Sequence, residues 1–295
     1  MRARVLRREM SDRESQDSEI MNAKIGFMQG RLSPLRNGRI QSFPWETWQD
    51  EFEAAADLNI RKLEWTIDSE NFASNPILTL VGREKIRRLK TLFNIETPSV
   101  TCDYFMENPP WKSDSEHLFM CVESILMGMT EIGAKILVIP LVDNSSLIDS
   151  NSYSRAFHFF SRVSDLLGAS DLKIAFETDL GPECFSDFMS EFAEERYGVN
   201  YDIGNSASLG FNPTEEFAAF GPRIINVHVK DRALGGTTVP LGTGNADFQT
   251  VFRCLNDHGY MGNLIMQTAR AHDGKHAEVL ATYREQIVRW MEEAK

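Results

Sequence analysis

Four polar side chains interrupt apolar, strand-like segments in the second half of the chain. They are Glu177, Asp202, His228 and Gln267, and each lies at or near the end of its segment. Successive members are separated by about one strand plus one helix, with an insertion before the last. If the segments are neighbouring parallel strands, their carboxyl ends aim all four side chains at one point.

One imidazole together with oxygen donors suits a hard or borderline divalent ion. We therefore predict a site for one Mn²⁺, Mg²⁺, Co²⁺ or Zn²⁺ ion. Each residue has an ordinary structural explanation when taken singly, because a lone Asp can cap a helix and a lone His can pack in a core. The coincidence of all four in phase favours the metal site.

A divalent ion bound beside a carboxylate indicates an enzyme that abstracts a proton next to a carbonyl group. A divalent ion that polarises the carbonyl stabilises the enediolate formed when the neighbouring proton leaves. We predict that Glu177 is the base that takes this proton.

The elements that position these residues follow an alternating pattern. Short apolar segments alternate with longer segments of helical period from Lys24 onward. The predicted strands are Lys24–Met28, Lys62–Thr66, Thr97–Thr101, Ile136–Pro140, Lys173–Glu177, Val199–Asp202, Ile224–Val229 and Asn263–Gln267. The predicted helices are Trp45–Leu58, Arg83–Phe93, Ser115–Ile132, Ser154–Leu167, Pro182–Ala193, Pro213–Phe220, Phe248–Asp257 and His276–Glu293.

Eight strands, each followed by one helix, favour a closed barrel over an open doubly wound sheet. No G-x-G-x-x-G motif follows the first strand, as a dinucleotide-binding fold would require. We therefore predict an α/β protein whose residues 23–295 form a single (β/α)8 TIM barrel domain.

The amino-terminal segment, residues 1–22, is expected to be a disordered extension outside the fold. It holds five Arg and five Asp or Glu, and its few apolar residues cannot repay the entropy of ordering it. A mitochondrial presequence would be poor in acidic residues, so this segment does not resemble one.

Composition excludes several classes of protein. With 31 Lys+Arg against 43 Asp+Glu, the 295-residue chain has a formal net charge of −12, which argues against binding nucleic acid. No apolar run is long enough to cross a membrane. Four scattered cysteines without C-x-x-C spacing are typical of free thiols in a reducing compartment, so we predict a cytoplasmic protein.

Two predicted connections are too long to be simple turns. Residues 29–44 follow the first strand and residues 103–114 follow the third. Both lie at strand carboxyl ends, where barrel enzymes place their substrate loops, so we expect them to cover the mouth of the barrel. Tyr104, Phe105 and Trp111 in the second loop either pack the loop or stack on substrate, and Tyr104 is our candidate for substrate contact.

The chain from Lys24 onward resembles the xylose isomerase-like TIM barrels, the sugar phosphate isomerase/epimerase family. The resemblance rests on Glu177 in AFETD, Asp202 in YDIGN, His228 in HVKD, the run PLGTGNADF from Pro240 to Phe248, and GYMGNLIMQTAR from Gly259 to Arg270. It implies a small sugar or sugar phosphate as substrate, and a homo-oligomer.

In this family a Glu, an Asp, a His and a second Glu bind one divalent ion, and the two Glu form the acid/base pair. Glu177, Asp202 and His228 match, but the second Glu position is Gln267. A carboxamide can offer an oxygen to a metal but cannot accept a proton at neutral pH. We therefore predict a single-base aldose–ketose isomerase. Epimerisation remains the alternative if Glu64 or Lys230 supplies a second proton.

Other polar residues are candidates for contacts at the mouth. Glu64 is predicted to end the second strand and point toward substrate, with structural hydrogen bonding as the alternative. Asp231 is expected to orient a ligand or cap its loop. Arg31 and Arg270 are candidates to grip a phosphate or carboxylate, with surface solvation as the alternative.

Two other classes of function are alternatives to a sugar isomerase. Endonuclease IV shares this barrel, but its phosphodiester cleavage needs a multi-zinc site rich in His, whereas His117, His158 and His276 fall in predicted helices. The chain is alternatively a non-catalytic sugar-binding barrel, because fold alone does not imply catalysis. Retention of Glu177 beside two metal-binding residues favours an enzyme.

Overall fold

Parallel strands close into an eight-stranded barrel in the computed structural model, which describes residues 20–113, 115–168, 170–271 and 273–295. The strands run around the barrel in the order β1-β10-β7-β6-β5-β4-β3-β2. Their bounds are β1 Ile25–Met28, β2 Leu63–Ile67, β3 Ser99–Cys102, β4 Ile136–Leu141, β5 Lys173–Thr178, β6 Tyr197–Asp202, β7 Ile224–Val229 and β10 Asn263–Met266. The predicted TIM barrel is therefore confirmed.

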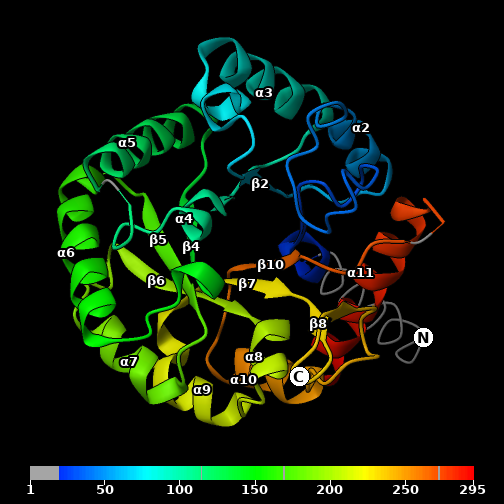
Figure 1. Cartoon of the computed structure of the whole chain (residues 1–295). Coiled ribbons are helices and arrows are strands. Elements are labelled where there is room, and N and C mark those ends of the chain that lie inside the picture. Colours follow the sequence, from blue (N-terminus) through cyan, green and yellow to red (C-terminus); the bar gives the residue numbers. More distant parts are fainter. Residues whose placement is uncertain (1–19, 114, 169, 272) are drawn as a thin grey trace, which may run out of the picture.

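Helices form a ring outside the strands (Figure 1). They are α2 Asp50–Asp57, α3 Leu80–Phe93, α5 Ser115–Ile132, α6 Ser150–Leu167, α7 Pro182–Ser190, α9 Pro213–Phe220, α10 Phe248–Asp257 and α11 His276–Glu293. Every residue of β1, β2, β3, β6 and β10 is buried. Burial on both faces explains why the strands read as apolar runs, with polar residues only at special positions.

Local sequence signals fix several helix boundaries. Asp149 and Ser152 form a capping box at the start of α6, and Asn212 caps α9, which opens with Pro213. The side chains of Asp149 and Asn212 accept hydrogen bonds from N–H groups of the first turn that would otherwise be unpaired. Pro213 fixes a backbone angle that suits the first turn of a helix. The predicted barrel strands and outer helices are all present, with boundaries that differ by a few residues.

Short elements between these units were not predicted, because they are too brief to show a period. They are α4 Tyr104–Glu107, α8 Ile203–Leu209, the hairpin of β8 Asp231–Arg232 with β9 Thr238–Val239, and the 3-10 turns η1 Phe72–Ser74, η2 Pro76–Leu78, η3 Asp143–Ser145 and η4 Gly221–Arg223. Several follow strand carboxyl ends and shape the mouth of the barrel.

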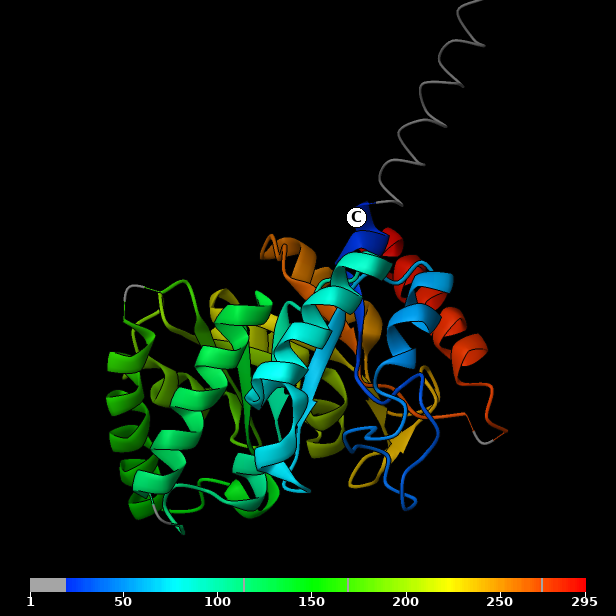
Figure 2. The ribbon, with the colours of Figure 1, turned by 90° about the horizontal axis from the view of Figure 1, so that it is seen from above.

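The two ends of the barrel differ. In the side view, the loop after β1 and the β8–β9 hairpin lie at one end, whereas the start of the described chain and the C-terminus lie at the other (Figure 2). Of the predicted extension, residues 1–19 lie outside the described residues. Residues 20–24 are helical and Met21 is buried, so the chain packs on the barrel from residue 20, whereas the predicted domain begins at residue 23. Within the described residues, no helix combines the length and the hydropathy needed to cross a bilayer.

Candidate functional site

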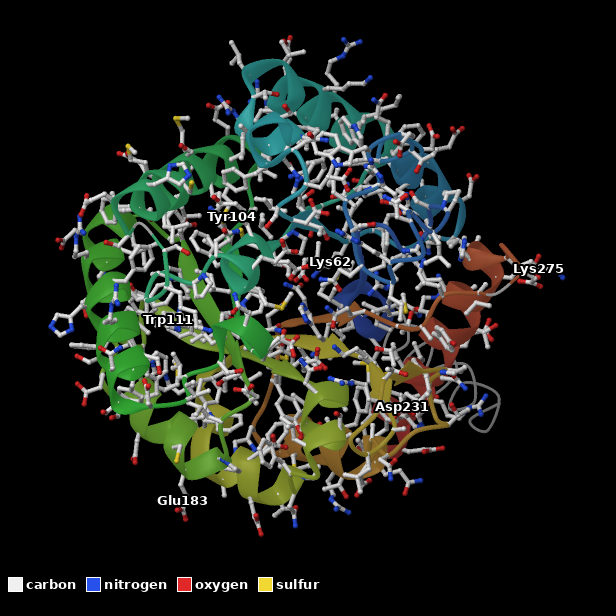
Figure 3. The ribbon with its side chains drawn as sticks, in the orientation of Figure 1. Lys62, Tyr104, Trp111, Glu183, Asp231 and Lys275 are labelled. Atoms are coloured by element: carbon white, nitrogen blue, oxygen red, sulfur yellow. The ribbon has the colours of Figure 1, made fainter. Side chains whose placement is uncertain are left out.

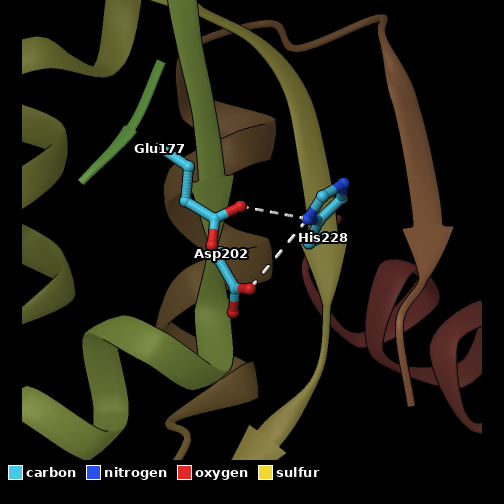
Figure 4. Close-up of side chains that lie close together, drawn as sticks. All are labelled: Glu177, Asp202 and His228. Atoms are coloured by element: carbon cyan, nitrogen blue, oxygen red, sulfur yellow. Dashed lines mark ion pairs between the residues drawn. The ribbon is translucent and has the colours of Figure 1, made fainter. Parts of the chain in front are cut away.

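Three of the predicted ligands converge at the carboxyl ends of three consecutive strands. Glu177 lies in β5, Asp202 ends β6, and His228 lies in β7 with its Cα opposite that of Asp202. One potential ligand atom from each residue lies within 4.8 Å of the others, and all three residues are buried. His228 Nδ1 is 3.3 Å from Glu177 Oε2 and 4.0 Å from Asp202 Oδ2 (Figure 4).

The surrounding atoms fit a divalent cation. Asp202 Oδ2 is buried and has no hydrogen-bond partner, although Lys230 Nζ lies 2.6 Å away as an ion pair. Gln267, directly after β10, has a buried Oε1 with no hydrogen-bond partner. A carbonyl oxygen that is buried and unpaired is costly unless it binds a ligand. Two carboxylates, an imidazole and this carbonyl together suit the ions predicted from the sequence.

Glu64 determines how the His228 ring is oriented. Glu64 Oε1 lies 2.7 Å from His228 Nε2, and the carboxylate also accepts hydrogen bonds from Ser99, Thr101 and Asn226 at 2.6, 2.7 and 2.9 Å. With Nε2 bound to Glu64, Nδ1 is directed toward Glu177 and Asp202, where a metal ion would replace the second ring proton.

The opposite charges of Glu64 and His228 shift the pKa values of both side chains. Burial disfavours a charged ring, but the Glu64 and Glu177 carboxylates outweigh it and raise the pKa of His228 to about 10. Burial likewise disfavours a charged Glu64, but the His228 ring and the hydroxyl donors outweigh it and lower the pKa of Glu64. Glu64 is therefore a carboxylate that is paired with His228, one of the predicted metal ligands.

The predicted contact of Glu64 with substrate is corrected by this geometry. Glu64 is fully buried, because β2 runs from Leu63 to Ile67. Glu64 is thus the second residue of its strand instead of the last, and it lies deep in the barrel. The structural hydrogen bonding that the sequence left as the alternative is what the structure shows.

Replacement of Glu64 by Gln is expected to weaken metal binding by about 10- to 100-fold, the usual effect of losing a carboxylate that orients a ligating His. Titration of the metal-free protein with Co²⁺ and Zn²⁺ measures the change. Glu96→Gln, at an exposed position next to the barrel, is the control. An affinity equal to that of the wild type would show that Glu64 does not support the ligand.

Two asparagines that the sequence analysis missed hold the Glu177 carboxylate. Asn200 Nδ2 donates to Oε2 at 2.8 Å and Asn205 Nδ2 donates to Oε1 at 2.5 Å. Asn200 lies two residues before Asp202 in β6, so strand alternation places both on the same face. That alternation was the available signal for Asn200, whereas Asn205 is brought in by the unpredicted helix α8.

A cavity of about 320 Å³ opens at this end of the barrel, within the range of small-molecule sites. Its lining includes Gln41, Asp103, Glu177, Lys230 and Gln267. The structure therefore brings the predicted base, Lys230 and the carboxamide of Gln267 to one solvent-accessible space, while Asp202 and His228 lie next to Glu177 outside the lining.

Asp103 is a lining residue that the sequence analysis named only as the start of a loop. Its side chain follows β3, and the residue is 8% exposed. Asp103 Oδ2 accepts a hydrogen bond from Gln41 Nε2 at 2.5 Å, and Gln41 Oε1 accepts one from Gln267 Nε2 at 2.8 Å. Burial raises the pKa of Asp103 to about 7; the Gln41 hydrogen bond opposes the rise and the Glu177 charge adds to it.

Arg31 and Arg270 hold the loop that carries Gln41. Both donate to the Ile40 carbonyl, at 3.1 and 3.3 Å, and Arg270 also donates to the Ser33 carbonyl. Burial and the nearby Arg270 lower the pKa of Arg31 to about 9. Neither arginine lines the cavity, so the structure places both behind the loop and not where they were expected to grip an anionic substrate.

Asp231 and Tyr104 are also absent from the cavity lining. Asp231 is buried and accepts hydrogen bonds from the backbone N–H groups of Gly242, Gly244 and Ala246, so it anchors the loop before α10, as the loop-capping alternative proposed. Tyr104 stacks on Phe72 with 4.1 Å between ring centroids. Packing is also the role of the other two aromatic residues of that loop, Phe105 and Trp111, which are buried in the core.

The remaining predicted positions agree with the structure. His117, His158 and His276 lie in α5, α6 and α11. Within the part of the chain that the structure describes, Glu177, Asp202 and His228 are the group of His, Cys, Asp or Glu side chains close enough together to hold an ion. A His-rich multi-metal centre of the endonuclease IV kind is therefore absent from these residues.

Comparison with known proteins gives the same architecture. The family model of the xylose isomerase-like TIM barrel matches residues 52–294. An inosose dehydratase of Clostridium botulinum (strain Eklund 17B / Type B) is 22% identical over 220 residues, which cover 62% of this chain and 72% of the dehydratase.

Solved structures with low sequence identity share the fold. The IOLI protein with a bound zinc atom has a TM-score of 0.71 and 14% identity, covering 92% of this chain and 99% of its own. The 3-keto-D-glucoside 4-epimerase of E. coli has a TM-score of 0.63 and 14% identity, covering 89% of this chain and 99% of its own.

Proposed function

The chain belongs to the xylose isomerase-like TIM barrel family, and from that premise we propose that it is a divalent-metal-dependent isomerase of a sugar or sugar phosphate. The observation that carries the proposal is the convergence of Glu177, Asp202 and His228 within 4.8 Å of one another. Their position next to a cavity of small-molecule size supports catalysis on a small ligand. The similarity to an inosose dehydratase supports a small polyhydroxylated substrate.

Glu177, Asp202 and His228 are the proposed metal ligands, with the unpaired Oε1 of Gln267 as the fourth. A divalent ion bound there supplies Lewis-acid stabilisation of negative charge on a substrate oxygen. The zinc atom in the IOLI structure supports such a site. Mn²⁺, Mg²⁺, Co²⁺ and Zn²⁺ all suit this set of donors.

Glu177 is the proposed base, because it is the carboxylate that both lines the cavity and lies at the ligand cluster. Asn200 and Asn205 fix its two oxygens, so little reorganisation is needed when the proton transfers. Lys230 lies beside Asp202 and lines the same cavity. We assign its ammonium group to the stabilisation of negative charge on a substrate oxygen.

Epimerisation at the same site is the second candidate. The structural similarity to a 3-keto-D-glucoside 4-epimerase favours it, and its first step is also proton abstraction next to a carbonyl. Inversion of a carbon requires a proton delivered to the opposite face. A non-catalytic sugar-binding barrel is the third candidate, and it predicts no proton exchange.

Proton exchange with solvent tests the proposal whichever isomer the enzyme forms. The protein is loaded with Mn²⁺, Co²⁺, Zn²⁺ or Mg²⁺ and incubated in D₂O with five- and six-carbon aldoses, ketoses and their phosphates. We expect at least one sugar to gain deuterium next to its carbonyl and to form an isomer, as followed by mass spectrometry and chromatography. Metal-stripped protein is the control. Sugar binding without exchange under any metal would instead support the binding barrel.

A further inference from the structure

A chain of two hydrogen bonds links the carboxamide of Gln267 to the carboxyl group of Asp103. Gln267 donates to Gln41, and Gln41 donates to Asp103, so three loops that follow different strands meet over the cavity. The direction of donation leaves Gln267 Oε1 without a partner. The side-chain carboxyl group of Asp103 accepts one hydrogen bond from the described residues, at Oδ2.

A second proton-transfer group is needed beside Glu177. Isomerisation moves one proton between two carbons and another between two oxygens, and a carboxamide at 267 can carry neither. The geometry points to Asp103 as the second proton-transfer group of the site, which moves the hydroxyl proton of the substrate while Glu177 moves the carbon-bound one. This inference rests on the proposed function.

The steps balance without an oxidant or a further reactant. Glu177 takes the proton from C2 of an aldose, and the electron pair of that C–H bond forms the C1–C2 double bond while the C1 carbonyl becomes an oxyanion. Asp103 accepts the proton of the C2 hydroxyl and returns it to the oxygen on C1. Glu177 then delivers its proton to C1, and the C2 carbonyl of the ketose forms.

Other acidic groups of the cavity are less suited to this role. Asp68 is held by the backbone N–H groups of Phe43 and Glu70 at 2.8 and 3.2 Å. Glu107 and Asp143 are exposed at the rim, where water competes for their protons. Asp103 combines burial, access to the cavity and a free Oδ1 among the described contacts.

Asp103→Asn separates the two proton transfers. The metal-loaded wild type, Asp103→Asn, Asp103→Glu and the exposed control Asp171→Asn are compared in D₂O with the panel of aldoses, ketoses and phosphates. For a sugar that the wild type converts, we expect Asp103→Asn to lower conversion by ~10²- to 10⁴-fold, the range for loss of an acid/base group. Deuterium exchange next to the carbonyl should persist, because Glu177 is intact. Asp103→Glu, which keeps a carboxyl group, should retain more conversion.

Metal content and thermal unfolding confirm that each variant is folded and loaded. Conversion by Asp103→Asn at the wild-type rate would overturn the inference and leave the proposed function standing. Loss of exchange together with conversion would also overturn it, since Asp103 would then be needed for the step assigned to Glu177. An absence of exchange by the wild type would count against the proposed function, and the inference would fall with it.

Discussion

Glu177→Gln is expected to lower turnover by ~10²- to 10⁴-fold, the range typical of a lost general base. The substitution keeps the shape of the side chain but removes its ability to accept a proton. It also turns one carboxylate oxygen into an NH₂ group that faces the donors Asn200 and Asn205. Because the carbon-bound proton would no longer be removed, deuterium exchange should fall together with conversion, unlike the effect of Asp103→Asn.

The measurement compares exchange and conversion for the two metal-loaded proteins on the sugar that the wild type converts. Glu183→Gln is the matched control, because Glu183 lies on α7 and points away from the barrel (Figure 3). Unchanged turnover in Glu177→Gln would contradict the assignment of the base. Metal and sugar binding with no activity in either protein would favour a non-catalytic barrel.

His228→Ala and Asp202→Asn are expected to lower metal content from about one ion per chain to near zero. His228 is the single imidazole of the proposed ligand set, and Asp202 provides a charged oxygen beside it. Asn at 202 keeps an acceptor for the Asn205 N–H group, which Asp202 caps at 2.9 Å, so α8 should be preserved. Elemental analysis after loading with Mn²⁺, Co²⁺ or Zn²⁺ and dialysis measures the stoichiometry.

His158→Ala, on the exposed face of α6, is the control for loss of an imidazole. Removal of His228 leaves Glu64 buried without its charged partner, which destabilises the fold. Asp202→Asn therefore provides the second test, and thermal unfolding shows whether each variant is folded. One ion per chain retained in both folded variants would place the metal elsewhere.

The alternation of apolar and helical segments was enough to predict the barrel, because strands that are buried on both faces must read as apolar runs. The same reasoning located Glu177, Asp202 and His228. Polar residues at the ends of such runs can be satisfied only where the barrel opens, and consecutive parallel strands bring their ends together. The apolar runs and the polar residues at their ends are local features that can be recognised in a single sequence.

Depth within the barrel was not determined by the sequence. Glu64 alternates correctly toward the interior, but the length of β2 places it below His228 instead of beside substrate. Alternation defines which face a side chain occupies, whereas the stagger of neighbouring strands sets its height along the barrel axis.

Contacts between loops were decided by the tertiary structure alone. Gln41, Asp103 and Gln267 follow three different strands, and Asp231 binds the backbone of a loop beyond its own hairpin. No local pattern predicts such pairs, because they depend on how the irregular segments fold over the mouth. The sequence by itself therefore determined the barrel and the three converging side chains, and closure of the barrel decided which polar groups line the cavity beside them.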